Sequence, residues 1–185
     1  MTTATRMTAP EYHAVSVEGD RTQLVDGAVV VNEPKPIHSL LQERVLFALG
    51  SWIRAGVGRG LVIPPTSITM DDYNVYGPDI IWFSEAHIPE NLREYPSRVP
   101  DLCVEIRSPG TWRYDVGTKK SVYEAGGLPE LWLVDDAAET VLVFRRSNPE
   151  APEFDVALEL TGGDTLESPL LSRFALPVTE LFAAA

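Results

Sequence analysis

The centre of the chain reads Pro100-Asp101-Leu102-Cys103-Val104-Glu105-Ile106-Arg107-Ser108-Pro109. This run is apolar and β-prone, and the alternation of a strand places Cys103, Glu105 and Arg107 on one face. The other face then carries Leu102, Val104 and Ile106. An ionised carboxylate in such a strand is costly unless another group pairs with it. Glu105 is therefore a candidate functional acid.

A second embedded acid lies upstream, in Pro78-Asp79-Ile80-Ile81. If the two strands are neighbours, Asp79 and Glu105 converge at a sheet edge. Either acid alone is better explained as a turn cap or as the partner of an arginine. Both together, followed by Lys119, favour a site. Two carboxylates and a lysine are the groups needed to hold a divalent metal over a phosphodiester and to activate a water.

The lysine lies in a predicted helix that starts at Asp115, as N-cap, and stops at Gly126-Gly127. Lys119 and Tyr123 are four residues apart and share a side of this helix, whereas Lys120 faces solvent. We interpret Asp115 as a cap rather than a metal ligand, and Tyr123 as a packing residue with a hydrogen-bonding tip.

The remaining pattern predicts an α/β fold. Asp26-Gly27 between β-branched runs indicates a hairpin over 23–31. Apolar spacing predicts a helix over 39–54, headed by His38, which would face the site if it is not merely structural. Strands are expected over 61–70, 75–83, 102–107, 131–135, 141–145 and 154–160, with a short helix over 177–184 and a loop with a helical turn over 85–100. This order favours one mixed central sheet flanked by helices, with an N-terminal β-hairpin.

Length and composition indicate one folded domain. The 185 residues suit a single core, which we expect over 11–185 after a flexible N-terminus over 1–10. No apolar run approaches the roughly 20 residues that cross a bilayer, so no membrane association is expected. Cys103 is the only cysteine, which excludes an internal disulfide and makes a cytoplasmic location the expectation. A thiol inside a strand, without a flanking His or Asn signature, is a poor nucleophile candidate.

The net charge of −12 argues against a protein that coats nucleic acid by long-range attraction. It does not exclude a nuclease, because a metal site needs acids and because Mg²⁺ with a local basic rim offsets repulsion. Candidates for that rim are Arg107, Arg113, Lys119, Lys120, Arg145 and Arg146.

These motifs, in this order, resemble the Uma2 family. The resemblance rests on Gly77-Pro78-Asp79-Ile80, on the run 100–109, on Asp115-x-x-x-Lys119-x-x-x-Tyr123 and on the run 127–135. It extends to Leu24-Val25-Asp26-Gly27 and to His38, so it covers nearly the whole chain. This family, also called domain of unknown function 820, belongs to the PD-(D/E)xK superfamily.

The resemblance implies a restriction-endonuclease-like core in which Asp79, Glu105 and the backbone carbonyl of Ile106 bind the metal. In the wider superfamily the lysine lies two residues after the second acid, where this chain has Arg107, whereas the family pattern supplies it from the next helix as Lys119. The chain departs from the family at Gln23, often a glutamate, and at Leu131, often a tyrosine, where only packing should change.

The leading hypothesis is a Mg²⁺-dependent endonuclease acting on DNA, with Mn²⁺ as a substitute and with Asp79, Glu105 and Lys119 as catalytic residues. The first alternative is a non-catalytic nucleic-acid-binding or regulatory module that keeps the fold, which the net charge and Gln23 favour. A second alternative is a metal-free glycoside hydrolase that uses the paired carboxylates, which leaves Lys119 without a role. A homodimer would present two sites to two DNA strands.

Overall fold

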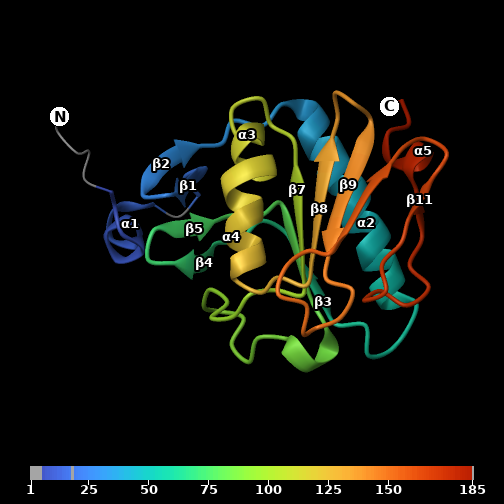
Figure 1. Ribbon diagram of the computed structural model, residues 1–185, viewed down its shortest axis with the longest axis horizontal. Coiled ribbons are helices and arrows are strands. Elements are labelled where there is room, and N and C mark those ends of the chain that lie inside the picture. Colours follow the sequence, from blue (N-terminus) through green and yellow to red (C-terminus); the bar gives the residue numbers. More distant parts are fainter. Residues whose placement is uncertain (1–5, 18, 185) are drawn as a thin grey trace.

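The computed structural model of the chain describes residues 6–17 and 19–184 and contains two main sheets (Figure 1). The larger has the order β10 (Val156–Leu160), β9 (Thr140–Arg145), β8 (Glu130–Asp135), β7 (Leu102–Ile106), β6 (Ile80–Phe83) and β3 (Leu61–Ile63). In it β7 and β8 are parallel, and the other neighbouring strands pair antiparallel. The predicted mixed central sheet is thereby confirmed.

The smaller sheet has the order β2 (Ala28–Val31), β1 (Thr22–Val25), β5 (Asn74–Tyr76) and β4 (Ile68–Asp71). Its first two strands are the predicted N-terminal hairpin. Asp26 and Gly27 have φ values of 51° and 73°, and two successive positive φ values are what a type I′ turn requires.

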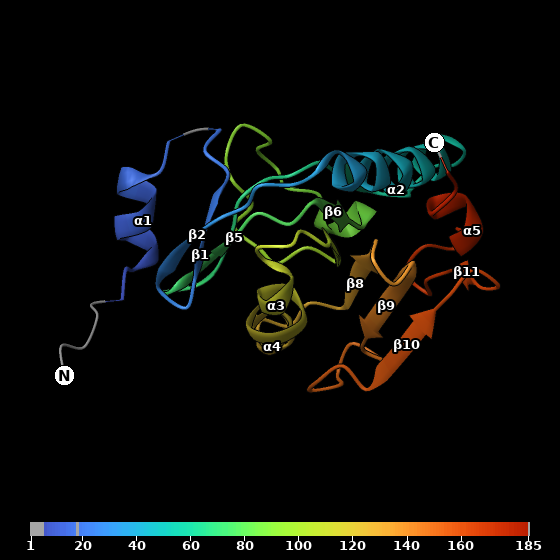
Figure 2. The ribbon, with the colours of Figure 1, turned by 90° about the horizontal axis from the view of Figure 1, so that it is seen from above.

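Helices cover both faces of the larger sheet (Figure 2). Helix α2 (Pro36–Arg54) packs on the side chains of Ile80, Leu102 and Val104. The opposite face, which carries Ile81, Cys103 and Leu131, packs against Tyr123 of α4 (Lys120–Ala125). The alternation predicted for 102–106 is confirmed, and Leu131 is a core residue of the second face.

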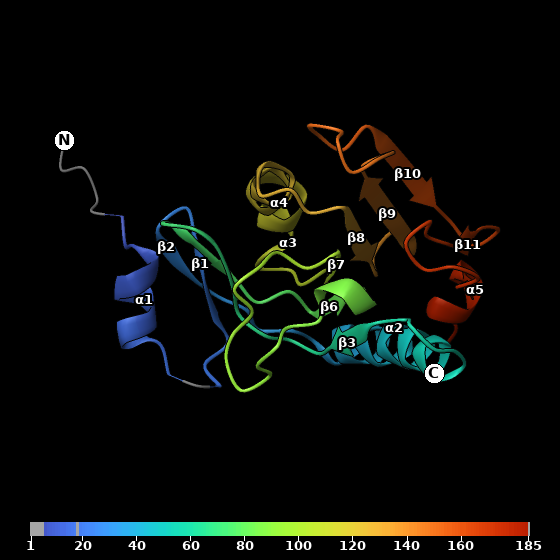
Figure 3. The same cartoon turned by 90° about the horizontal axis from the view of Figure 1, so that it is seen from below.

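The C-terminal segment closes the α2 side of the molecule. Strands β11 (Thr165–Leu166) and β12 (Leu176–Pro177) form a small third sheet that leads into helix α5 (Val178–Leu181). The Arg44 guanidinium of α2 donates to the backbone carbonyl of Leu181 at 2.8 Å, and Figure 3 shows α5 beside α2. A short final helix was predicted and is confirmed.

The sequence prediction missed helix α1 (Ala9–Val15). Thr8 and Glu11 form a capping box at its start, and the Ala9 N–H donates to Asp72 O at 2.7 Å. The predicted flexible terminus over 1–10 therefore does not extend to Ala9 and Pro10. Residues 1–5 of it lie outside the described residues, and the single-domain boundary stays a prediction.

Two predicted long strands are each split by proline. The run 61–70 breaks into β3 and β4 at Pro64-Pro65, and the run 75–83 breaks into β5 and β6 at Gly77-Pro78. Proline has no N–H to give to a ladder, so each break marks where the chain leaves one sheet for the other.

Helix α2 starts three residues earlier than predicted, at Pro36, and the loop after β6 contains the expected helical turn, η1 (Glu85–His87). No helix within the described residues has the length and apolarity to span a bilayer.

Candidate active site

Asp79 and Glu105 face each other across two strands. Ile80 pairs with Val104 in the antiparallel β6–β7 register, and extending that register by one residue sets Asp79 opposite Glu105. Directly opposed residues lie on the same face, with Cβ atoms about 4.5–5.5 Å apart. The exposed fractions are 5% and 3%. The structure thus brings the two predicted acids together at the end of the ladder.

Ile106 joins this pair through its backbone. Its N–H donates to Asp79 Oδ2 at 2.7 Å. The same register sets Ile106 opposite Pro78, and proline cannot donate a hydrogen bond to the facing carbonyl. The ladder therefore leaves the Ile106 carbonyl spare at the edge where the two carboxylates meet.

Lys119 reaches the site from the helical segment that covers the Cys103 and Glu105 face of the sheet. Its Nζ lies 2.6 Å from Glu105 Oε1 and 2.8 Å from Asp115 Oδ1, and it is only 2% exposed. The Tyr123 hydroxyl donates to the same Glu105 Oε1 at 2.7 Å. The prediction that Lys119 and Tyr123 share a helix side is confirmed.

Asp115 is not the N-cap that the sequence suggested. The helical segment begins three residues earlier, with α3 (Trp112–Tyr114), and Asp115 opens a π-helical turn, η2 (Asp115–Lys119), that runs into α4. Asp115 is buried and paired with Lys119 across that turn. π-Turns inside helices are frequent at functional sites, and this one holds Lys119 between two acids. The predicted stop at Gly126 is confirmed.

Burial and charge set the protonation of the cluster. Desolvation raises the pKa of Glu105 to about 8 although the Lys119 ammonium opposes the shift, with Asp115 and Asp79 adding repulsion. Desolvation alone would lower the pKa of Lys119, but Asp115 and Glu105 together raise it above its usual range. Lys119 is therefore a fixed cation rather than a proton donor near neutral pH.

His38 and Gln42 of α2 support Asp79 from the opposite side. His38 Nε2 lies 3.1 Å from Asp79 Oδ2, and the Gln42 amide donates to the Asp79 carbonyl at 2.9 Å. His38 lies in the first turn of α2 and is buried. The sequence left its role open, and the structure places it against the site.

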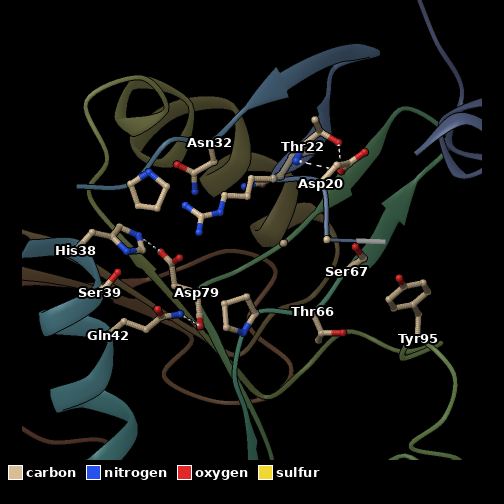
Figure 4. Close-up of a pocket in the computed structure, with 16 residues that line it drawn as sticks. Asp20, Thr22, Asn32, His38, Ser39, Gln42, Thr66, Ser67, Asp79 and Tyr95 are labelled. Atoms are coloured by element: carbon tan, nitrogen blue, oxygen red, sulfur yellow. Dashed lines mark hydrogen bonds and ion pairs between the residues drawn. The ribbon is translucent and has the colours of Figure 1, made fainter. Parts of the chain in front are cut away.

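A cavity of about 520 Å³ opens beside Asp79 (Figure 4). His38, Gln42 and Asp79 form one wall, and Tyr95 lies across from them. Arg21, Tyr95 and the cavity itself were missed, because the segments that meet there are far apart in sequence. Gln23, noted as a departure from the family pattern, also lines this cavity.

None of the six predicted rim residues lines the Asp79 cavity. Lys119 is buried, and Arg107 donates to both oxygens of Asp135 at 2.8 and 2.9 Å, away from Glu105. Arg146 binds backbone carbonyls. Arg145 lines a different cavity, of about 400 Å³, between β10 and the C-terminal segment. The one Lys or Arg among the described residues that line the Asp79 cavity is Arg21.

The donor set suits a hard cation. Within the described residues no group of three His, Cys, Asp or Glu side chains could hold a metal ion. However, Asp79 Oδ1 and Glu105 Oε2 have no hydrogen-bond partner among those residues, and the Ile106 carbonyl is a third oxygen. Mg²⁺ commonly takes one or two carboxylates and completes its shell with water, so these residues fit it.

A family model whose description reads "putative restriction endonuclease" matches residues 9–179. The chain belongs to the Uma2 family. The resemblance seen in the motifs is thereby confirmed. A search of curated proteins finds no match to this Uma2 chain.

Its structure is similar to the crystal structure of a protein from Anabaena variabilis ATCC 29413, described as a "putative nuclease belonging to DUF820". The two share 20% identity with a TM-score of 0.79, over 96% of this chain and 98% of the other. This likeness shows the fold, and the predicted restriction-endonuclease-like core of the Uma2 chain is confirmed.

Proposed function

We propose that this Uma2 protein is a Mg²⁺-dependent endonuclease that hydrolyses DNA phosphodiester bonds. The observation that carries the proposal is the opposition of Asp79 and Glu105 at the end of the β6–β7 ladder, with Lys119 held beside them. Family membership supports a nuclease. The metal, the DNA substrate and the catalytic roles are our inference from the donor set.

Asp79, Glu105 and the Ile106 carbonyl would hold the metal. When bound, Mg²⁺ polarises the scissile phosphate and lowers the pKa of an attacking water. The Tyr123 hydroxyl and Lys119 both fix Glu105 Oε1, which leaves Oε2 for the site. The Ile106 N–H donates to Asp79 Oδ2, which also lies 3.1 Å from His38 Nε2, and Oδ1 is left for the site. Each acid thus presents one oxygen in a set orientation.

Lys119 supplies positive charge next to the reacting phosphate. Its ammonium would orient the attacking water or stabilise charge that develops on the phosphorane, as a preorganised donor does elsewhere. Asp115 holds the lysine from the other side, so the cation stays in place if Glu105 turns towards a metal.

The rival is a nucleic-acid-binding or regulatory module without turnover. The net charge of −12 and the neutral Gln23 in the cavity favour it, as does the complete pairing of Lys119 between two acids. The rival predicts binding without cleavage under every metal condition.

The test is cleavage of supercoiled plasmid and of linear DNA in Mg²⁺, in Mn²⁺ and in chelator. We expect nicking in either metal, none in chelator, and none from Glu105→Gln. The matched control is Glu130→Gln, because Glu130 is also a buried acid on a strand but bonds only Trp132 and Ser168, at 2.6 and 2.7 Å. Equal cleavage by wild type and Glu105→Gln, or cleavage in chelator, would refute the proposal.

A further inference from the structure

One amide that lines the Asp79 cavity has an unpaired oxygen. Gln23 is 7% exposed, and its Oε1 is buried without a hydrogen-bond partner among the described residues. A buried polar group in that state is destabilising, and native structures rarely keep one. Because Gln23 lines the cavity, a ligand there can satisfy it.

The position of Gln23 ties this amide to the proposed site. It lies on β1, and the backbone of Gly77 passes beside it, close enough that a Cβ at Gly77 would be 4.0 Å from Gln23 Cγ. Gly77 and Asp79 also line the cavity. A group bound to Gln23 is therefore a near neighbour of anything bound at Asp79.

The rest of the lining indicates what kind of group fits. Tyr95 lies across the cavity from His38 and Asp79 (Figure 4) and is 60% exposed. One face of its ring stacks on His13, with the ring centroids 6.4 Å apart, so a base would stack on the other face. Arg21 adds a guanidinium to a lining that is otherwise neutral or acidic. A side-chain amide offers an adjacent donor and acceptor, the arrangement that recognises a base edge. Aromatic rings stack on bases of any sequence.

We propose that this cavity binds one unpaired nucleotide, with its base edge on Gln23, its ring against Tyr95 and its phosphate charge near Arg21. A volume of about 520 Å³ has room for such a unit, since ligand pockets run from roughly 300 to 1,000 Å³. The inference rests on the proposed function for its choice of nucleotide over other polar ligands. It deepens that function by making the preferred substrate one with an extruded or single-stranded nucleotide next to the cleaved bond.

The test compares binding by fluorescence anisotropy in chelator, where metal-dependent cleavage does not interfere. The probes are a fully paired DNA duplex, the same duplex with one bulged nucleotide, and the bulged duplex with an abasic site in place of that base. We expect the bulged duplex to bind about tenfold more tightly than the other two, the scale of one stacked base. A mononucleotide, deoxyadenosine monophosphate, is added as competitor.

Three variants assign the preference to the cavity. Gln23→Leu and Tyr95→Ala should each reduce it to about threefold or less. Leu92→Ala should leave it unchanged, because Leu92 is 63% exposed in the same loop but does not line the cavity. Gln23→Leu removes no hydrogen bond within the described residues, so its melting temperature should be equal to or above that of the wild type.

The outcomes separate the two proposals. A bulge preference that depends on Gln23 and Tyr95 supports the inference even if no metal produces cleavage, in which case only the nuclease proposal fails. If the mononucleotide binds with the same dependence while paired and bulged duplexes bind equally, the cavity binds a free nucleotide and the inference of an extruded or single-stranded substrate is overturned. If neither probe binds in a way that depends on both residues, the inference is overturned, even when plasmid is cleaved.

Discussion

Lys119 Nζ lies 2.6 Å from Glu105 Oε1, with both side chains almost fully removed from solvent. Removing either partner of a buried ion pair is strongly destabilising, because the charge that remains is buried without compensation. Lys119 has a second acid, Asp115, and Glu105 has a second donor, Tyr123. The cluster therefore tolerates movement of one member without leaving another unpaired, which suits a site that must admit a metal.

Lys119→Met should lower Mg²⁺-dependent cleavage by at least about 10²-fold, the scale of one positioned charge. The control is Lys120→Met, whose ammonium lies 3.9 Å from Glu124 and packs near Phe144, away from Glu105. Steady-state cleavage rates of the two purified variants decide the matter. Near-equal activities would remove Lys119 from the mechanism.

Arg107→Met should leave the cleavage rate within about threefold of wild type, because its guanidinium is held by Asp135 and lies near the Trp112 ring. Loss of that partly exposed pair should cost no more than about 1 kcal/mol of stability. Chemical denaturation and plasmid nicking measure the two effects. An inactive but folded Arg107→Met, beside an active Lys119→Met, would reverse the assignment of the catalytic cation.

The stability of the metal-free protein should depend on pH through Glu105. Its pKa is raised from 4.5 to about 8 in the fold, so the folded state holds a proton that the unfolded chain has released. The stabilising contribution is complete below about pH 4.5 and is lost as pH rises through about 8. The Glu105→Gln variant lacks this pH-dependent contribution to stability. Between about pH 5 and about pH 9 the melting temperature of the wild type should fall by more than that of Glu105→Gln. Parallel plots of melting temperature against pH would contradict the raised pKa of Glu105.

Mn²⁺ should raise the melting temperature of the wild type, since a ligand that binds only the folded state stabilises it. Asp79→Asn should abolish this increase, whereas Glu130→Gln should retain it because Glu130 bonds Trp132 and Ser168 instead. Calorimetric titration of Mn²⁺ gives the affinities directly. An undiminished increase in Asp79→Asn would place the metal elsewhere.

Homodimer formation also stays a prediction. Light scattering at working concentration measures it, and a monomeric mass would refute it.

The sequence predicted the two acids and the lysine because each leaves a local signal. A carboxylate inside an apolar strand is conspicuous, and alternation assigns its face. The shared helix side of Lys119 and Tyr123 was predicted from their four-residue spacing. The mixed sheet followed from the order of the elements, but the breaks at Pro64-Pro65 and at Gly77-Pro78 were not predicted.

The errors concern features that depend on tertiary contacts. Asp115 has the residue type of an N-cap, but its side chain is bound to Lys119 inside a π-turn, and only the packed helix reveals this. The cavity is built by β1, α2 and the loop around Tyr95, so no window of sequence contains it. Arg107 occupies the place of the superfamily lysine, and its pairing with Asp135 follows only from the register of β7 with β8.

The length of the crossing between β5 and β6 limits how the chain could evolve. Asp79 is the last of the three residues, 77–79, that cross from β5 to β6, and it is in phase with Glu105 only while that number is kept. Because strand side chains alternate, inserting or deleting one residue there would turn the acid to the Ile80 face of the sheet if the apolar residues of β6 shifted with it, or move it out of line with Glu105 if they did not. Loop length at this crossing is thus as constrained as the identity of the acid. Homologous chains that retain the chemistry should keep the number of residues in this bridge.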